Sequence, residues 1–325
     1  MEYINVCENG IHIVFGITEK RQLKLLHFSR NEFKEEDLCK TGPECKAEDR
    51  MRKEQFLEEA FQLVQISLSG YDRPYEKHGN KHIVTAPGYL LTYVGMEDEV
   101  NETGRRLTII QEDKEVTHVR VETVMQFYNG TSIVRMFNKV TNEGEETQCL
   151  EYLSSFCYTG IEKEGSADSD AKMRIRIPYN GWQKEMSIKE YTFGDVGLAQ
   201  TQPGVYQRTS QVLEVTNTGN WSSKKYLPLG YIENTQAHTS LFWQIEHNGS
   251  WHYEIGDQNT HFYVCVSGPT EVQSHWFKNL APGESFVSLP VALGVAEDCF
   301  EKAVDELTRY RRLIPRPNKA NQNLP

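Results

Sequence analysis

The sequence predicts a large antiparallel β sandwich of two sheets, followed by a single helix near the C-terminal end. Segments with strand character recur along almost all of the 325 residues, and turns rather than helices separate them. The chain is rich in aromatic residues, with 16 Tyr, 14 Phe and 5 Trp, as expected for a β protein with a large core. Only residues 298–313 have convincing helical periodicity.

The first predicted element is a hairpin, because residues 11–15 and 23–28 alternate between apolar and polar positions around a polar turn. Residues 31–59 are charged and poor in β-branched side chains, so they are expected to form a loop or a short helical insertion. Further strands are predicted at 61–68, 90–94, 107–111, 116–127, 132–140, 147–159, 172–177, 210–216, 226–233, 240–247, 251–255, 261–267 and 285–294. Because no helices alternate with these strands, a doubly wound α/β fold is excluded.

The helix is predicted from apolar residues that recur at helical spacing, namely Phe300, Ala303, Val304, Leu307 and Tyr310. We therefore divide the chain into a β-sandwich domain at 1–296, a C-terminal helix at 297–314 and a linker at 315–325. Residues 315–325 have the look of an interdomain linker, with nothing after them in this chain to link to.

Charge and composition exclude several classes of function. The net charge of −11 repels phosphate backbones and anionic lipids, so neither nucleic acid nor a membrane is an expected partner. The first residues contain no secretory signal pattern, which predicts a cytoplasmic protein. The seven Cys form no Cys-x-x-Cys pair, so reduced thiols are expected, with no metal site and no cofactor.

Several runs of sequence, in this order, resemble the N-terminal domain of family 36 α-galactosidases. They are PYNGW at 178–182, GNWSSKKYLPLG at 219–230, WQIEHNGSWHYEI at 243–255, SGPTE at 267–271, HW at 275–276, LAPGESF at 280–286 and ELTRYRR at 306–312. The resemblance covers about residues 89–324, whereas the first 75 residues match the family poorly. It implies a galactose-mutarotase-like β-supersandwich that packs against a (β/α)8 barrel in a longer, often tetrameric, enzyme. That enzyme removes terminal α-galactosyl groups with retention. The implied partners are therefore the barrel of the same polypeptide, further copies of the chain and, through the parent enzyme, a galactoside.

The chemistry of a retaining glycosidase is not visible in this chain. Such enzymes need two carboxyl groups about 5 Å apart, one as nucleophile and one as acid and base. The family places its nucleophile in a Lys-x-Asp segment, and no Lys of this sequence has Asp two positions later. We therefore expect no catalytic residue here and no α-galactosidase activity from the chain alone.

Four residues are candidates to lie beside a sugar: Trp182, Trp251, His252 and Trp276. An indole can stack on the C–H face of a pyranose, although Trp within a strand more often anchors a core. His252 also belongs to a second pattern, in which His247 and His252, with Glu246 and Glu254 beside them, provide metal ligands or the acid–base pair of a mutarotase. The alternative is a hairpin with outward polar groups, because Asn-Gly-Ser between the two histidines is typical of a turn.

Two further alternatives remain open at this stage. The chain could be an autonomous sandwich that binds sugars or acts as a mutarotase-like epimerase, rather than a support for a barrel. The arginines of the predicted helix could bind phosphate or form salt bridges to the absent barrel; they are Arg309, Arg311 and Arg312.

Overall fold

The computed structural model describes residues 1–38, 61–71, 81–199, 211–258, 261–297 and 299–314. Most of the predicted insertion at 31–59, and all of the predicted linker at 315–325, lie outside these residues. The strands are β1 (Glu2–Glu8), β2 (Ile11–Ile17), β3 (Leu23–Ser29), β4 (Ile66–Leu68), β5 (Thr92–Val100), β6 (Arg105–Asp113), β7 (Val119–Phe127), β8 (Ile133–Asn142), β9 (Gln148–Thr159), β10 (Met173–Gly181), β11 (Lys184–Tyr191), β12 (Val212–Asn217), β13 (Leu229–Asn234), β14 (Thr239–Ile245), β15 (Trp251–Gln258), β16 (His261–Ser267), β17 (Lys278–Leu280), β18 (Ser285–Val287) and β19 (Val291–Glu297). The helices are α2 (Ala86–Leu90), α3 (Ser169–Lys172), α4 (Glu271–Ser274) and α5 (Phe300–Leu313), with 3-10 turns η1 (Glu35–Leu38) and η2 (Gly194–Val196).

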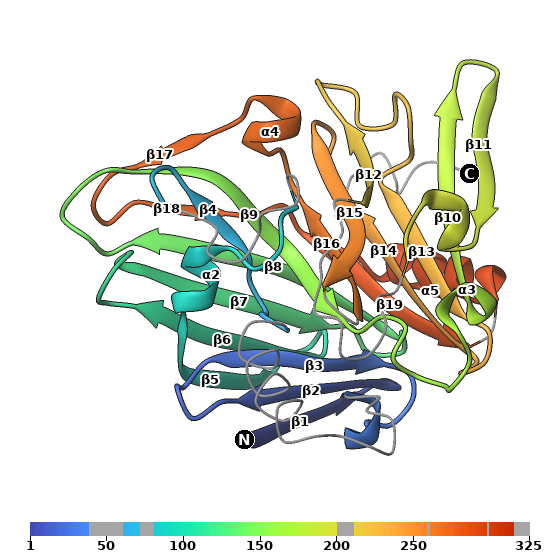
Figure 1. The fold of residues 1–325 in the computed structure, drawn as a ribbon, viewed down its shortest axis with the longest axis horizontal. Helices are drawn as coiled ribbons and strands as arrows, with labels where there is room; N and C mark the ends of the chain where they lie inside the picture. The colour runs from blue at the N-terminus through green and yellow to red at the C-terminus, as the bar shows by residue number, and fades with distance from the viewer. Residues whose placement is uncertain (39–60, 72–80, 200–210, 259–260, 298, 315–325) are drawn as a thin grey trace.

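The strands form three antiparallel sheets (Figure 1). A ten-stranded sheet has the order β11-β10-β13-β14-β19-β8-β7-β6-β5, with β18 paired to β8. A six-stranded sheet has the order β12-β15-β16-β9-β17, with β4 paired to β9. We call these the large and the small sheet. The predicted mainly β sandwich with a C-terminal helix is confirmed, and a three-stranded sheet, β1-β2-β3, is added to it.

The main core lies where the large and small sheets face each other. Trp243 on β14 and Trp251 and Tyr253 on β15 are buried there, and Trp243 meets Tyr253 edge to face at 5.0 Å. Gly230 on β13 lies opposite Trp243, and a methyl group added at Gly230 would come within 2.0 Å of the indole. The glycine is therefore required by the close approach of the ring.

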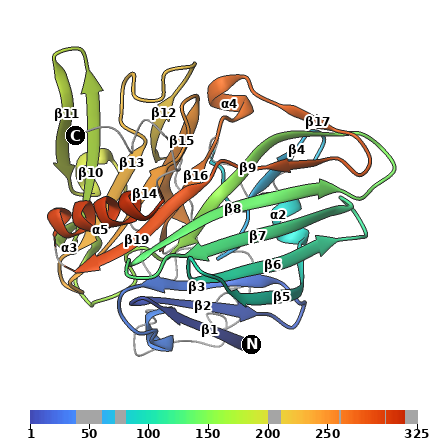
Figure 2. The same ribbon diagram turned by 180° about the vertical axis from the view of Figure 1, so that it is seen from behind.

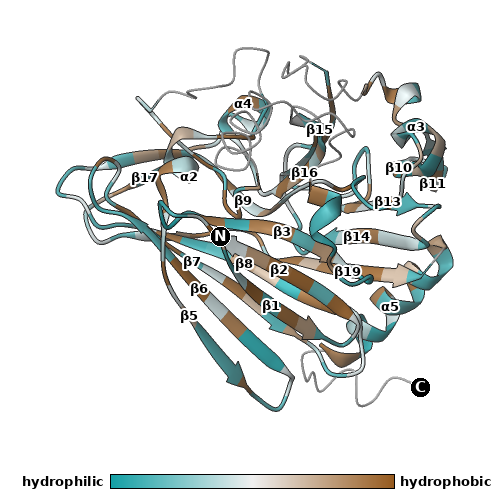
Figure 3. Cartoon of the chain, turned by 60° about the horizontal axis from the view of Figure 1, so that its bottom comes forward, coloured by the Kyte–Doolittle hydropathy of each residue, from teal (hydrophilic) through white to brown (hydrophobic). Residues whose placement is uncertain are grey.

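Apolar residues of the N-terminal hairpin join the same core, which the hydropathy colouring of β2 and β3 makes visible (Figure 3). The predicted pairing of the segments at 11–15 and 23–28 is confirmed by the register of β2 and β3. The far end of β5, by contrast, is hydrophilic and exposed.

Helix α5 covers the opposite face of the large sheet (Figure 2). Its buried residues Ala303, Leu307 and Tyr310 pack on Tyr231 and Phe242, among other residues of that face. The hydroxyl of Tyr310 also donates a hydrogen bond of 2.6 Å to Glu246, which forms an ion pair with Arg135 at 2.6 Å. The predicted helix is confirmed, with its first residue at Phe300 rather than at 297.

Three expectations about local structure are corrected. Residues 61–65, predicted as strand, precede the short strand β4, and residue 90 ends the one-turn helix α2. The segment 246–250 is not a hairpin turn: β14 pairs within the large sheet, whereas β15 pairs with β12 and β16 of the small sheet. The chain therefore crosses between sheets at this point.

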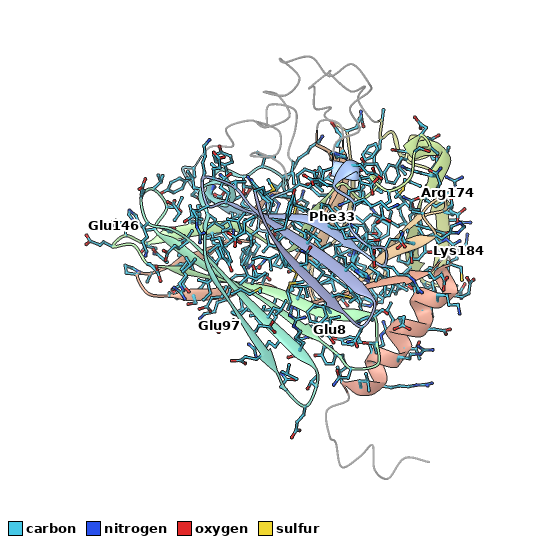
Figure 4. All side chains as sticks on the ribbon, turned by 90° about the horizontal axis from the view of Figure 1, so that it is seen from below. Glu8, Phe33, Glu97, Glu146, Arg174 and Lys184 are labelled. Carbon is cyan, nitrogen blue, oxygen red and sulfur yellow. The ribbon has the colours of Figure 1, made fainter. Side chains whose placement is uncertain are left out.

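Several exposed charged side chains lie at the periphery, among them Glu97, Glu146 and Lys184 (Figure 4). Within the described ranges, none of the helices has the length and apolar character needed to cross a membrane.

Candidate functional site

Strand β15 contributes side chains to two different environments. Trp251, Tyr253 and Ile255 belong to the main core, whereas the alternate residues His252 and Glu254 point to the outer face of the small sheet. Their side chains are completely buried there. Buried polar groups need partners, so this outer face is the most informative polar region of the structure.

A third residue, His82, completes a buried group that we call the His82–His252–Glu254 cluster. One possible ligand atom of each residue lies within 4.8 Å of those of the other two residues. Among the described residues, this cluster is the one group of three His, Cys, Asp or Glu side chains that could hold a metal ion. His252 Nε2 lies 3.4 Å from Glu254 Oε2. The backbone N–H of His82 donates to Glu254 Oε1 at 2.7 Å, and the two imidazole rings meet edge to face at 5.4 Å.

Each member of the cluster is held by one further side chain. The hydroxyl of Tyr263 donates to Glu254 Oε1 at 2.7 Å. Thr216 shares a hydrogen bond of 2.7 Å with His252 Nδ1, and Gln273 Oε1 lies 3.1 Å from His82 Nε2. Three strands and two connecting segments therefore fix the orientation of the cluster.

The segment that contains His82 seals the cluster from solvent. Ile83 and Val84 pack against Tyr263 and Cys265, with Cys157 beside them. Next to them, Lys81 forms a fully buried ion pair with Asp257 at 2.6 Å. This segment therefore acts as a cover for the outer face of β15 and β16.

The electrostatics of the cluster favour the ionised form of Glu254 and the neutral forms of Tyr263 and Cys265. Burial alone would raise the pKa of Glu254, but hydrogen bonds from His252 and Tyr263 and the nearby imidazoles lower it below its ordinary value. Burial and the Glu254 carboxylate raise the pKa of Tyr263 well above its ordinary value. Burial and a hydrogen bond with Cys157 do the same for the pKa of Cys265, so this thiol is not an activated nucleophile.

This arrangement does not provide open acid–base catalysis. Glu254 Oε1 accepts two hydrogen bonds, Oε2 faces His252 Nε2 at 3.4 Å, and the side chains of His82, His252 and Glu254 have no more than about 1% of their surface exposed. A glycosidase needs two carboxyl groups that flank the sugar, whereas the partners of Glu254 are imidazoles, an amide and a phenol. The cluster therefore holds the segment around His82 against strand β15, and it leaves no room for a sugar.

The four sequence-predicted candidates do not form one site. Trp251 and His252 are completely buried, and contact of any of the four residues with a sugar stays a prediction. The indole of Trp251 serves the core, where its N–H donates to the carbonyl of Ser222. Trp276 is half-buried against Phe286, and Trp182 is 87% exposed at the β10–β11 turn.

The two predicted His–Glu pairs are also separated. Glu246 and His247 follow β14 of the large sheet, where Glu246 binds Arg135 and Tyr310. His252 and Glu254 lie on the small sheet. The reason is the sheet crossing at 246–250, which the Asn-Gly-Ser sequence did not reveal.

Sequence reasoning missed His82, Tyr263 and Gln273. No local pattern connects His82 to Glu254, because 172 residues separate them. A usable signal was present in the strands themselves. Polar residues alternate with apolar ones over 251–255, at His252 and Glu254, and in 261–267, at His261, Tyr263 and Ser267. This spacing in two otherwise largely apolar strands indicates a buried polar face that needs partners from elsewhere.

A second region of interest is the end of the molecule that carries two exposed indoles, Trp182 and Trp221. Trp221 is 59% exposed and donates from its indole N–H to Ser223 at 3.1 Å. The carbonyl of Ser223 accepts a hydrogen bond from Asn180, two residues before Trp182. The two indoles thus belong to adjoining loops, which we call the indole loops.

Comparison with known proteins gives a clear structural result. No protein-family model and no curated protein sequence matches the chain. Among solved structures, it is similar to a family 36 α-galactosidase from Geobacillus stearothermophilus, with 14% identity and a TM-score of 0.68 over 96% of this chain and 43% of the other. It is also similar to an α-galactosidase from Lactobacillus brevis, with 12% identity and a TM-score of 0.66 over 96% and 42%.

A third similar structure is the galactosidase domain of an α-galactosidase–sucrose kinase, with 13% identity and a TM-score of 0.67. That match covers 93% of this chain and 41% of the other. The chain thus spans about two fifths of the length of these proteins, and its fold is that of their N-terminal domain.

Proposed function

We propose that this chain is a non-catalytic β domain of an α-galactosidase of glycoside hydrolase family 36. In that role it supports a catalytic (β/α)8 barrel and contributes to oligomerisation. The observation that carries the proposal is the coverage of the structural match. Nearly all of this chain superposes on α-galactosidases, but more than half of each of those proteins lies outside the match.

The sealed polar cluster supports a non-catalytic role. An active site requires room for substrate next to its acid and base groups, and the side chain of Glu254 has no exposed surface. The catalytic carboxyl groups would then belong to the barrel, as they do in other (β/α)8 enzymes.

A docking face for the barrel or for a second copy is supported by the groove between helix α5 and the β10–β11 hairpin. The groove has a volume of about 80 Å³, and its lining includes Met186, Ile188, Leu229 and Val304. Met186 is 51% exposed. Apolar surface of this kind marks interaction sites on soluble proteins.

Co-purification tests the proposed support of a barrel. The chain and the residues encoded directly after it in its gene should be produced as two polypeptides in the same cells. We expect them to elute together, and Met186→Ser should weaken that association while Glu97→Gln, at an exposed position far along β5, should not. A reading frame that ends at Pro325, or two polypeptides that elute separately, would contradict the proposal.

Self-association is tested by light scattering across a concentration series. We expect dimers or larger assemblies of the chain, because its docking face remains in contact with water when no barrel is present. A strictly monomeric chain at high concentration would count against the oligomerisation part of the proposal.

A second candidate function is an autonomous sugar-binding module, which the exposed Trp182 and Trp221 favour. Titration of the chain with galactose, followed by Trp fluorescence, separates the two candidates. The sugar-binding candidate requires saturable quenching that Trp182→Ala and Trp221→Ala reduce. The support-domain proposal expects no saturable change.

A further inference from the structure

Two buried His–Glu pairs in this protein differ in one informative way. His261 Nδ1 and Glu162 Oε1 are 2.6 Å apart, a short hydrogen bond. His252 Nε2 and Glu254 Oε2 are 3.4 Å apart, well beyond the usual length of about 2.9 Å. Both pairs are buried, so solvent does not explain the difference.

The longer separation is the one expected between two ligands of a zinc ion. Zinc binds His nitrogen and carboxylate oxygen at about 2.1 Å in tetrahedral geometry, which places neighbouring ligand atoms roughly 3.4 Å apart. One ring nitrogen of His82 lies within 4.8 Å of a ligand atom of each of the other two residues, so a shift on the order of 1 Å would bring it to the separation expected around zinc. The structure thus has three ligands of the right chemical types around one point.

The groups around the cluster match the outer shell that metal ligands require. Metal-binding imidazoles use their second nitrogen for a hydrogen bond, and ligating carboxylates are themselves hydrogen-bonded. Thr216 is the partner of His252, Gln273 is the partner of His82, and Tyr263 is the partner of Glu254. Gln273 is oriented in turn by its own bond to Glu214 at 2.7 Å.

Charge also favours a cation at this position. The hydrogen-bond partners of Glu254 among the described residues are an amide, a phenol and an imidazole. The nearest buried ammonium group in the cover, that of Lys81, is paired with Asp257. A fully buried carboxylate without a permanently charged partner is costly, and a divalent cation would offset its charge.

We propose that His82, His252 and Glu254 form a structural zinc site that fastens the cover segment at 81–85 to strand β15. The site is independent of the proposed role in an α-galactosidase. Because the cluster is sealed, zinc would enter while the chain folds, and the bound ion would tie together residues that are far apart in the sequence.

The test uses the whole chain, stripped of metal with a chelator in denaturant and refolded with or without Zn²⁺. After desalting, elemental analysis should find about one zinc per chain. The chain refolded with zinc should also have the higher melting temperature. Cobalt in place of zinc should show the visible absorption of a four-coordinate ion.

Matched variants decide whether this cluster is the site. His252→Gln and Glu254→Gln should each remove most of the bound zinc, whereas His261→Gln, in the other buried pair, should retain it. Thr216→Val leaves all three ligands in place, and it should weaken zinc binding by about 10-fold to 100-fold without loss of the β-type circular dichroism spectrum.

Two outcomes would overturn the proposal. One is a refolded, β-structured chain that keeps less than about a tenth of an equivalent of zinc. The other is zinc binding that His252→Gln, Glu254→Gln and Thr216→Val leave unchanged, because the ion would then be bound elsewhere.

Discussion

The two faces of strand β15 are equally buried and chemically opposite. One face carries Trp251 and Tyr253 into the core between the sheets, and the other carries His252 and Glu254 into a layer of hydrogen-bonded groups. The apolar face is stabilised by area and close packing, which depend little on the direction of any single contact. The polar face is stabilised only when each donor meets its acceptor.

The difference has a consequence for how each face tolerates change. Apolar cores accept substitutions that conserve volume, whereas one lost partner leaves a buried polar group unsatisfied. The polar face of β15 is therefore the more specific of the two, and it holds distant segments in one arrangement.

The largest loss of stability is expected from a substitution on the apolar side. Trp243→Ala removes a completely buried indole that contacts Tyr253 and lies over Gly230, and it should lower the free energy of unfolding by about 3–5 kcal/mol. Urea denaturation measures this change. Trp182→Ala, at an exposed position, should stay within about 0.5 kcal/mol of the unmodified chain. A Trp243→Ala cost as small as that of Trp182→Ala would mean that the indole is not packed in a core.

A smaller effect is expected on the polar side. Glu254→Gln keeps the size of the side chain but removes its charge and replaces one acceptor oxygen with an NH2 donor, so the groups around Glu254 lose one of their two acceptors. We expect a loss of about 1–3 kcal/mol in the free energy of unfolding of the metal-free chain, measured by the same denaturation experiment. Glu97→Gln, at an exposed position on β5, is the control. Equal stabilities of the two variants would show that neither the charge nor the second oxygen of Glu254 stabilises the fold.

The smallest expected effect is a change in the free energy of unfolding with pH, which should differ between the two faces. The pKa of Glu254 is lower in the folded chain than its ordinary value of 4.5, so the unfolded chain takes up this proton more readily. The stabilisation from Glu254 is thus present above about pH 4.5 and is lost as the pH falls through the folded pKa. The stability difference between the metal-free chain and Glu254→Gln should shrink between pH 6 and pH 3, as measured by urea denaturation. The Trp243→Ala difference should not shrink in parallel, and a parallel decrease would remove the distinction between the faces.

The sequence predicted the strands of the interior and the helix α5 because each buries one periodic face. It missed β1 and β11, which expose much of both faces and therefore show little alternation. It also missed the crossing between sheets at 246–250. A turn sequence specifies a local change of direction, but which sheet receives the next strand depends on packing with distant residues.

The polar cluster was only half visible in the sequence. His252 and Glu254 stood out by their spacing, but their third partner, His82, belongs to another part of the chain. In a single sequence no local rule brings such residues together. The exposed fractions of Trp182 and Trp251, which determine whether an indole can meet a sugar, likewise follow from the fold rather than from the residue type.

The most direct test of the proposed support-domain role is the hydrolysis of an aryl α-galactoside by two proteins. One is this chain, and the other is this chain joined to the residues encoded after it. We predict turnover by the longer protein and none above a blank by the chain alone, because the carboxyl groups of catalysis are expected in the barrel. Turnover by the chain alone that survives repurification would contradict the account, as would a longer protein that folds but leaves every α-galactoside intact.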